Sequence, residues 1–525
     1  MQLKIEDLTI EQKLGMVFCA RRFAEADDVE FTAEMIRKRA LGCLQMPSYS
    51  PKVCEKLKEV LKDADYPVLV FNDTEMGFPT SKIPKIPLMA LAACNNKEYY
   101  RVFAKRIARD ARAECLNGTW GPVLDVLRAD GPCRVYRSFS DDPKAVAEAA
   151  EVMAEVYKKS GYLSTGKHYP GGHDYVFDTH MAEGLSSLSK EELIEFDLAP
   201  YMYLYKKGLL PCVMSGHTVY PKIDPDRPAS LSKPVIDVIR ELGYDGLMFT
   251  DSFAMMGILQ KYGEENVYGM AIEAGNDVVL PNFRHSSREC FEMLVKNFED
   301  GAFSEERLNE AVRRVLTAQA FVAKEPEEPV EFTAEDEVLF DQISRDCLTP
   351  VTDEGVDIVL SNPESTDRLI IIVTENCYDV TKENPEIEVA HWYNPKVLAE
   401  KIRAEFPGAG IEFIPEFSGQ KDNDRVLTAA SGYKEVVFIS FCTTTSYLGT
   451  DSLTKRTEMV MNCLVASGKV SAVVHFGNPL ALQPIAHVPR RLFGYMSSAS
   501  LPYAIDALKG NITPKGKLPI RVDLP

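Results

Sequence analysis

Residues 246–252 read Gly-Leu-Met-Phe-Thr-Asp-Ser, an apolar run that ends abruptly in an aspartate. Similar short apolar runs recur along the first part of the chain, with longer helical patterns between them. They occupy residues 15–19, 41–46, 67–72, 121–126, 163–168, 210–216 and 277–281. Strand and helix alternating at this spacing predict parallel strands joined by crossover helices. About eight such units in roughly 300 residues predict an α/β fold that begins with a (β/α)8 barrel of the TIM type.

A second α/β domain is expected after the barrel. Residues 324–337 read KEPEEPVEFTAEDE, in which prolines and dense negative charge indicate an exposed linker. Strand-like runs then return at residues 368–374, 411–414, 435–441 and 470–476. We predict a catalytic barrel at 1–323, an acidic linker at 324–345 and a C-terminal α/β sandwich domain at 346–525. That last domain is expected to be an open sheet with helices on both faces.

Charge and composition restrict the partners of the protein. The 525 residues carry 59 lysines and arginines against 78 aspartates and glutamates, a net charge of −19. This balance disfavours nucleic acid and anionic membranes as partners. The N-terminus shows no signal peptide, and no apolar stretch reaches transmembrane length. Twelve cysteines without a Cys-x-x-Cys pair predict reduced core residues in a cytoplasmic protein.

Polar residues gather at or near the C-terminal ends of the apolar runs. In a barrel these ends share one face, and that face carries the active site. For any one residue, the alternative is that polarity simply resumes where a strand ends. Six such residues together indicate a site: Asp73, Asp125, His168, His217, Asp251 and Asn282.

Two segments supply the groups that glycoside hydrolysis needs, a nucleophilic carboxylate and a separate proton donor. Asp251 closes a mostly apolar strand and is a candidate nucleophile, although it can also cap a helix predicted at 252–259. Asp178 and His180 lie two residues apart on a glycine-rich loop, so both side chains project to one side of an extended stretch. A carboxylate beside an imidazole can act as general acid and then as base. The alternative is a surface loop whose histidine has no role.

Metal binding is a further interpretation of this loop, with His168, His173, Asp174 and His180 as ligands. No helical His-x-x-x-His pair supports it, so neither a metal nor a cofactor is expected.

Other polar residues are candidates for sugar binding, each with a purely structural role as an equal alternative. Lys167 offers donors for hydroxyl groups, and His168 offers either donor or acceptor. Asp73 can accept two hydroxyls of a pyranose, with Glu75 close by as a supporting acid. Arg137 can bind an acyl or hydroxyl oxygen, or bond to Asp141.

Several motifs occur in a fixed order along the barrel region. Residues 122–126 read PVLDV, 137–139 read RSF, 167–172 read KHYPGG, 178–180 read DTH and 250–253 read TDSF. They resemble the Pro-Val-x-Asp-Val, Arg-Ser-Phe, Lys-His-Phe-Pro-Gly-His-Gly, Asp-Ser-His and Ser-Asp-Asp motifs of glycoside hydrolase family 3. The resemblance is specifically to the β-N-acetylglucosaminidase branch of that family. It covers about residues 8–320 closely, and residues 511–519 resemble the close of the family's second domain.

The resemblance implies a retaining exo-acting β-N-acetylglucosaminidase whose partner is a small carbohydrate. Asp251 would be the nucleophile and His180, held by Asp178, the acid/base. A histidine in this role marks the N-acetylglucosaminidase branch. The sugar would be bound by Lys167, His168, Asp73 and Arg137.

Two departures and two alternatives accompany this expectation. Residues 171–173 read GGH where the family usually has Gly-His-Gly. Residues 74–78 read TEMGF where the family commonly has Gln-Glu-Gly-Gly-Arg, so an arginine expected to hold a sugar hydroxyl is missing. The first alternative is a phosphorylase of the same sugar, because a histidine acid/base repels an incoming phosphate less than a carboxylate does. The second is a catalytically weak sugar-binding protein.

Overall fold

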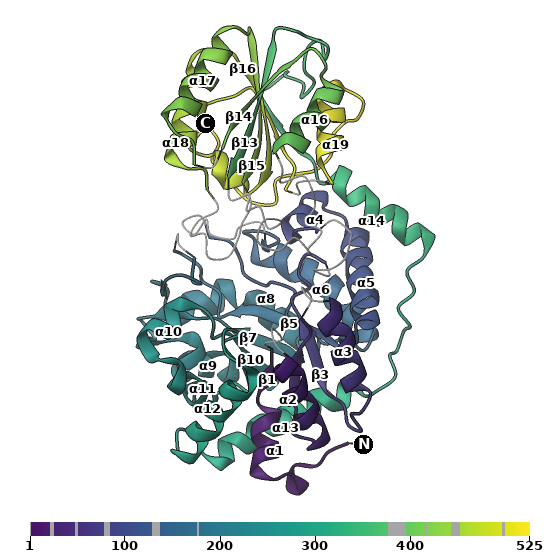
Figure 1. Ribbon diagram of the computed structural model, residues 1–525, viewed down its shortest axis with the longest axis vertical. Coiled ribbons are helices and arrows are strands. Elements are labelled where there is room, and N and C mark those ends of the chain that lie inside the picture. The colour runs from purple at the N-terminus through teal and green to yellow at the C-terminus, as the bar shows by residue number, and fades with distance from the viewer. Residues whose placement is uncertain are drawn as a thin grey trace. The chain divides into compact units, whose positions relative to one another are not determined.

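The structure is a computed structural model that describes residues 2–21, 26–47, 51–77, 85–128, 137–175, 178–375, 395–415, 417–442, 452–495 and 499–525. Its residues group into two compact units (Figure 1). The first unit comprises Met1–Ile83, Tyr100–Gly131 and Asp141–Ala334. The second comprises Pro84–Tyr99, Pro132–Ser140 and Glu335–Pro525.

In its described residues, the first unit is built on eight parallel strands. Four of them pair in the order β1 (Cys19–Ala20), β2 (Cys43–Gln45), β3 (Leu69–Asn72) and β4 (Gly118–Thr119). The others pair in the order β11 (Val278–Leu280), β10 (Leu247–Ser252), β7 (Cys212–Ser215) and β5 (Thr165–Tyr169). Bridges between Gly118 and Leu163 and between Phe18 and Val279 join the two sheets at both edges. The strands therefore close into a barrel, as the sequence predicts.

Helices surround the strands. α9 (Lys233–Glu241) shows why they form: Ser232 caps it by accepting a hydrogen bond from the Val235 N–H, and four apolar residues of its short sequence are buried. The other helices of this unit are α1 (Ile10–Met16), α2 (Ala26–Arg37), α3 (Pro51–Leu61), α5 (Lys97–Ala113), α6 (Pro143–Lys159), α7 (Lys190–Glu192), α8 (Ala199–Lys206), α10 (Met256–Tyr262), α11 (Glu264–Ala274), α12 (Ser287–Glu299) and α13 (Glu305–Val322), with α9 at Lys233–Glu241. A small sheet of β6 (Gly184–Leu185), β8 (Thr218–Tyr220) and β9 (Asp224–Pro228) adds to them.

The barrel interior can be assigned from side-chain contacts between strands that are not neighbours. The rings of Phe71 on β3 and Phe249 on β10 lie 5.1 Å apart, so both point inward. Because side chains alternate along a strand, Asp73 and Asp251, two residues further on, lie on the same inward face. The barrel mouth thus receives two of the predicted site residues.

Two predicted strands and one predicted helix are shifted. In the run at 15–19, Gly15 and Met16 end α1, and β1 begins only at Cys19. The run at 121–126 lies beside β5, where Leu124 N–H donates to Lys167 O at 2.7 Å, but β4 precedes it at Gly118–Thr119. Pro122, which has no N–H to donate, interrupts that run. The helix predicted at 252–259 begins at Met256, because β10 continues to Ser252.

The second unit contains an open six-stranded sheet in the order β12-β17-β16-β15-β13-β14. Its strands are β12 (Thr349–Thr352), β13 (Arg368–Glu375), β14 (Gly410–Ile414), β15 (Glu435–Cys442), β16 (Val470–Gly477) and β17 (Arg490–Phe493). All neighbours are parallel except β12 and β17. α16 (Pro395–Glu405) and α19 (Leu501–Lys509) cover one face, and α17 (Gln420–Ser431) and α18 (Lys455–Ala466) the other (Figure 1). The predicted second α/β domain is confirmed, with β12 and β17 as additions.

Early parts of the chain complete this second unit. α4 (Leu88–Cys94) is almost wholly apolar, and Lys517 N–H donates to Ala93 O at 3.0 Å. The Tyr99 hydroxyl donates to the Asp346 carboxylate at 2.5 Å, at the end of α14 (Ala334–Asp346). The predicted domain boundaries at 323 and 346 stay a prediction. They did not place these early segments in the second domain.

Two sequence-based expectations about location concern thiols and membranes. The ten cysteines within the described part of the chain are all free thiols. Among the described helices, none is both long and apolar enough to cross a membrane.

Candidate active site

Asp251 lies at the C-terminal end of β10. Its Oδ1 accepts a hydrogen bond from Ser252 N–H at 2.7 Å, and its Oδ2 lies 4.0 Å from His168 Nε2. Burial alone would raise the pKa of Asp251, but the nearby imidazoles of His168, His217 and His180 outweigh burial and lower it. The Ser252 N–H acts in the same direction. Asp251 is therefore ionised at neutral pH, as a nucleophilic carboxylate must be.

His168 is held by a buried carboxylate from the neighbouring segment. Asp125 Oδ1 accepts from the His168 backbone N–H at 2.8 Å, and Oδ2 lies 2.8 Å from His168 Nδ1. Burial would raise the pKa of Asp125, but His173 and His168 lower it below its usual range. An ionised carboxylate only accepts, so Nδ1 of His168 carries a proton and Nε2 is the ring atom that faces Asp251.

Lys167 joins two carboxylates of the β3 end. Its Nζ lies 2.7 Å from Asp73 Oδ1 and 2.5 Å from Glu75 Oε1. The side chains of Lys167 and Glu75 are buried, whereas the Asp73 side chain is 53% exposed. The structure thus brings the predicted residues Lys167 and Asp73 together and leaves the Asp73 carboxylate accessible. Glu75 is a third member of this group.

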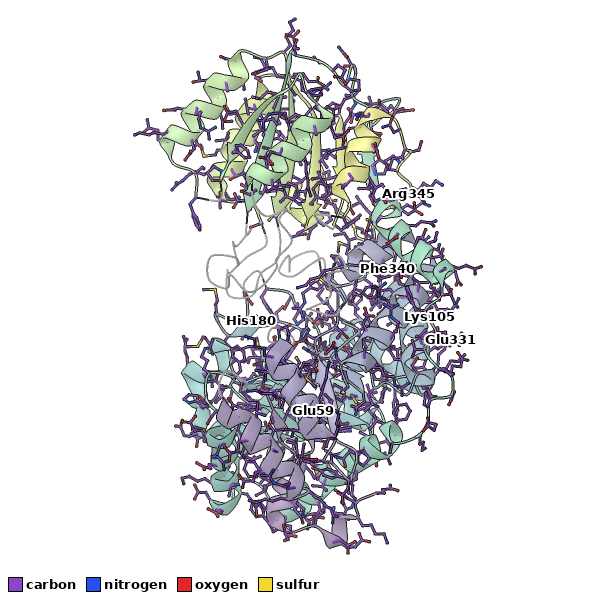
Figure 2. All side chains as sticks on the ribbon, turned by 45° about the vertical axis from the view of Figure 1, so that its right-hand side comes forward. Glu59, Lys105, His180, Glu331, Phe340 and Arg345 are labelled. Atoms are coloured by element: carbon purple, nitrogen blue, oxygen red, sulfur yellow. The ribbon has the colours of Figure 1, made fainter. Side chains whose placement is uncertain are left out.

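Asp178 and His180 form the predicted pair. Asp178 Oδ1 accepts from the His180 backbone N–H at 3.0 Å and lies 2.8 Å from His180 Nδ1. His180, at the upper edge of the first unit in Figure 2, accepts at its carbonyl from Met256 N–H at 2.9 Å. Because Met256 follows Asp251 by five residues, this bond ties the loop to the segment after the candidate nucleophile. The effect of His180 on the Asp251 pKa reflects the same proximity.

His217 supports the backbone beside Asp251. Its Nδ1 lies 2.7 Å from Ser230 Oγ, and its Nε2 donates to the Ser252 carbonyl at 3.0 Å. Its ring stacks on Phe253 with centroids 5.3 Å apart. Burial lowers the pKa of His217. The sequence indicates His217 only as a polar strand-end residue, and its contacts with Ser230 and Ser252 could not be read from local spacing.

The glycine-rich loop binds protein groups. Gly171 and Gly172 have φ values of +88° and +68°, a region that favours glycine. Gly172 N–H donates to Asp197 Oδ1 at 2.9 Å, and Asp174 accepts from Ser187 N–H at 3.1 Å. No group of three or more histidine, cysteine, aspartate or glutamate side chains in the described ranges is arranged to hold a metal ion. The metal interpretation therefore gains no support.

Arg137 and the departure after Asp73 complete the account of the predicted residues. Arg137 lies in the second unit, within Pro132–Ser140, and is half-buried. Its role in sugar binding stays a prediction. Phe78, at the position of the arginine expected from the family, lies outside the described residues.

The barrel region of the chain is similar to known protein sequences. Residues 9–318, more than half of the chain, match the glycosyl hydrolase family 3 N terminal domain. A "Beta-N-acetylglucosaminidase/beta-glucosidase" from Cellulomonas fimi is 27% identical over 327 residues, 59% of this chain and 57% of that protein. A "Beta-hexosaminidase" from Neisseria gonorrhoeae is 33% identical over 237 residues, 41% of this chain and 64% of that protein. The chain thus matches less than two thirds of the length of these two relatives.

Solved structures resemble the whole chain. A glycoside hydrolase family 3 β-N-acetylglucosaminidase from Paenibacillus sp. str. FPU-7 has a TM-score of 0.79 at 23% identity, over 99% of this chain and 100% of that one. A structure described as "Beta-glucoside phosphorylase BglX" has a TM-score of 0.78 at 21% identity, over 98% and 94%. At these identities the likeness concerns the fold.

Proposed function

Because the chain belongs to glycosyl hydrolase family 3, we propose that it is a retaining, exo-acting β-N-acetylglucosaminidase. The enzyme class, a glycoside hydrolase acting on carbohydrate, follows from the family. The observation that carries the finer assignment is the imidazole–carboxylate pair of His180 and Asp178, 2.8 Å apart on a loop bonded to the segment after Asp251. A histidine acid/base marks the N-acetylglucosaminidase branch of the family, and relatives named β-hexosaminidases support that branch.

The first half-reaction uses two groups. Ionised Asp251 attacks the anomeric carbon, and the bond from that carbon to the leaving oxygen breaks. His180 donates its Nε2 proton to the leaving oxygen, since its Nδ1 is engaged by Asp178. The product is a covalent glycosyl-enzyme on Asp251.

The second half-reaction reverses these roles. His180, now neutral, takes a proton from a water molecule at Nε2, and the water oxygen attacks the anomeric carbon. Asp251 leaves as a carboxylate, and N-acetylglucosamine is released with its β-configuration retained. Two inversions at the same carbon account for that outcome.

Sugar binding is assigned to the strand ends around Asp251. The exposed Asp73 carboxylate accepts hydrogen bonds from sugar hydroxyls, while its ion pair with Lys167 holds it in place. His168 presents Nε2 to a hydroxyl because Asp125 occupies its Nδ1. Arg137 is proposed to bind a further oxygen of the sugar.

A β-N-acetylglucosaminide phosphorylase is the second candidate. The observation that favours it is the same acid/base, since a neutral imidazole does not repel phosphate as a second carboxylate would. In that reaction phosphate replaces water as the acceptor and the product is the sugar 1-phosphate. The predicted cytoplasmic location stays a prediction for either activity.

A panel of aryl β-glycosides, run with and without inorganic phosphate, tests the proposal. We expect release of β-N-acetylglucosamine, with retention visible by proton NMR before mutarotation. If sugar 1-phosphate forms and its formation depends on phosphate, the activity is phosphorolysis and not hydrolysis. Sugar binding without turnover of any glycoside would contradict both activities.

A further inference from the structure

Arg21 is a buried cation without a counter-ion in the described part of the chain. It is 9% exposed, and its Nε donates to Gln45 Oε1 at 2.9 Å. No described carboxylate forms an ion pair with it, and its Nη1 is buried with no hydrogen-bond partner. Burying a charge without a partner is costly, and unsatisfied buried polar atoms are rare in native structures. Among the described residues, Arg21 lacks a carboxylate partner although the chain, with a net charge of −19, has an excess of carboxylates.

The position of Arg21 is at the barrel mouth. It directly follows β1, and Gln45 is the last residue of β2. The Cys43 thiol interacts with Cys19 beside it and with Cys212 across the barrel, so these thiols lie inside. Alternation along the strands then puts Arg21 and Gln45, two residues beyond Cys19 and Cys43, on the inward face.

Arg21 therefore shares the face that carries the candidate active site. Around the barrel the strands follow the order β10, β11, β1, β2, β3. Arg21, at the end of β1, is two strands from Asp251 at the end of β10 and two strands from Asp73 after β3. Two strand spacings amount to about 10 Å. That separation suits a group attached to the reacting sugar better than the anomeric centre itself.

An aromatic ring fixes the guanidinium group. Phe283 follows β11, is 41% exposed, and lies 5.3 Å from Arg21 Cζ. Arg284 Cζ lies 5.4 Å from the same ring, and Arg284 Nη1 donates to Ala254 O at 2.5 Å, three residues after Asp251. Stacking and the Gln45 bond hold the Arg21 fork in one orientation, so little ordering remains when a ligand binds.

We propose that Arg21, stacked on Phe283, binds an oxyanion at the barrel mouth beside the sugar site. A carboxylate or phosphate matches the planar guanidinium fork and supplies the missing negative charge. Two sources have this chemistry: an acidic substituent on the leaving group of the substrate, or a free phosphate ion. The proposal rests on the proposed function only for the identity of the neighbouring sugar.

Equilibrium binding tests the site without turnover. The probes are 4-carboxyphenyl and 4-carbamoylphenyl 1-thio-β-N-acetylglucosaminide, which differ in one charge and resist hydrolysis, together with inorganic phosphate. Affinities are measured by isothermal titration calorimetry. We expect Arg21→Gln to raise the Kd of one anionic probe by about tenfold and the Kd of the carbamoyl probe by less than about twofold. Arg39→Gln is the matched control, because Arg39 precedes β2 at the opposite end of the barrel and pairs with Asp65.

The pattern of losses distinguishes the two sources. A loss confined to the carboxyphenyl probe assigns the site to a substituent, and a loss confined to phosphate assigns it to the free ion. Equal affinities of wild type and Arg21→Gln for every anionic probe would overturn the proposal. Arg21→Lys keeps the charge without the fork and should lose affinity by an intermediate factor, which tests the site even if Arg21→Gln fails to fold. Turnover of the neutral O-glycoside separately tests the proposed function.

Discussion

Replacing Asp178 by asparagine removes a charge from the proposed acid/base pair with little change of shape. Asp178 Oδ1 accepts from both the backbone N–H and Nδ1 of His180, at 3.0 and 2.8 Å. An asparagine Oδ1 can keep both contacts. A hydrogen bond to a charged group contributes about 1.5–3 kcal/mol, against about 0.5–1.5 kcal/mol for a neutral pair. The protonated ring therefore loses on the order of 1.4 kcal/mol, which equals about one pH unit.

The sign of the effect follows from the role of the ring. His180 must carry a proton to assist departure, and without the charge it releases that proton at lower pH. The alkaline limb of the kcat/KM profile should therefore move down by about one pH unit for the phenyl glycoside. The 2,4-dinitrophenyl glycoside should be almost unaffected, because its leaving group needs no proton.

The matched control is Asp174→Asn, a carboxylate of the same loop whose side chain bonds to Ser187. Its pH profile should keep the wild-type alkaline limb. An unshifted limb in Asp178→Asn, or the same shift in both variants, would refute the assignment of the pair.

Three further predictions follow from the barrel and the sheet. Asp251→Asn should lose nearly all turnover with an unchanged melting temperature, and a 2-fluoro mechanism-based inhibitor should label Asp251 in peptide mapping; a label on another carboxylate would contradict its role. β-N-Acetylglucosaminides should exceed β-glucosides in kcat/KM by at least about tenfold, which needs about 1.4 kcal/mol of transition-state binding; equal values would exclude the branch. Burial lowers the pKa of His475 to about 4, so only the unfolded chain gains this proton as the pH falls below about 6.5. The unfolding free energy of the second unit should then drop by on the order of 3 kcal/mol towards pH 4 in urea titrations, and His475→Gln should remove that slope.

The strand pattern predicts the barrel because burial inside parallel sheets makes runs such as 246–250 almost continuously apolar. It fails where packing between distant segments decides the structure. Gly15 lies in α1 with so close a neighbour that an added Cβ would stand 1.7 Å from Ala40 O. Nothing in the local sequence shows that Gly15 belongs to a closely packed helix and not to a strand.

The site is predictable to the extent that its groups are close in sequence. The spacing of Asp178 and His180 predicts their pair, and the structure brings them together. The bond between Asp125 and His168 joins residues 43 positions apart, so it emerges only when the strands are placed side by side. Arg21 was missed for the same reason. The available signal was only its place two residues after the apolar run at 15–19.

The early segments of the second unit can complete their folding only after the C-terminal residues have been synthesised. Tyr99 and its partner Asp346 are separated by 247 residues, and Ser140 and its partner Pro519 by 379. During translation α4 emerges long before the C-terminal residues that contact it, such as Lys517, and contacts across such separations form slowly. We expect the nascent chain to carry the apolar helix Leu88–Cys94 uncovered until almost the last residues are made. A shortened chain that ends after the barrel would keep that surface exposed permanently, and it should aggregate rather than yield an isolated catalytic barrel.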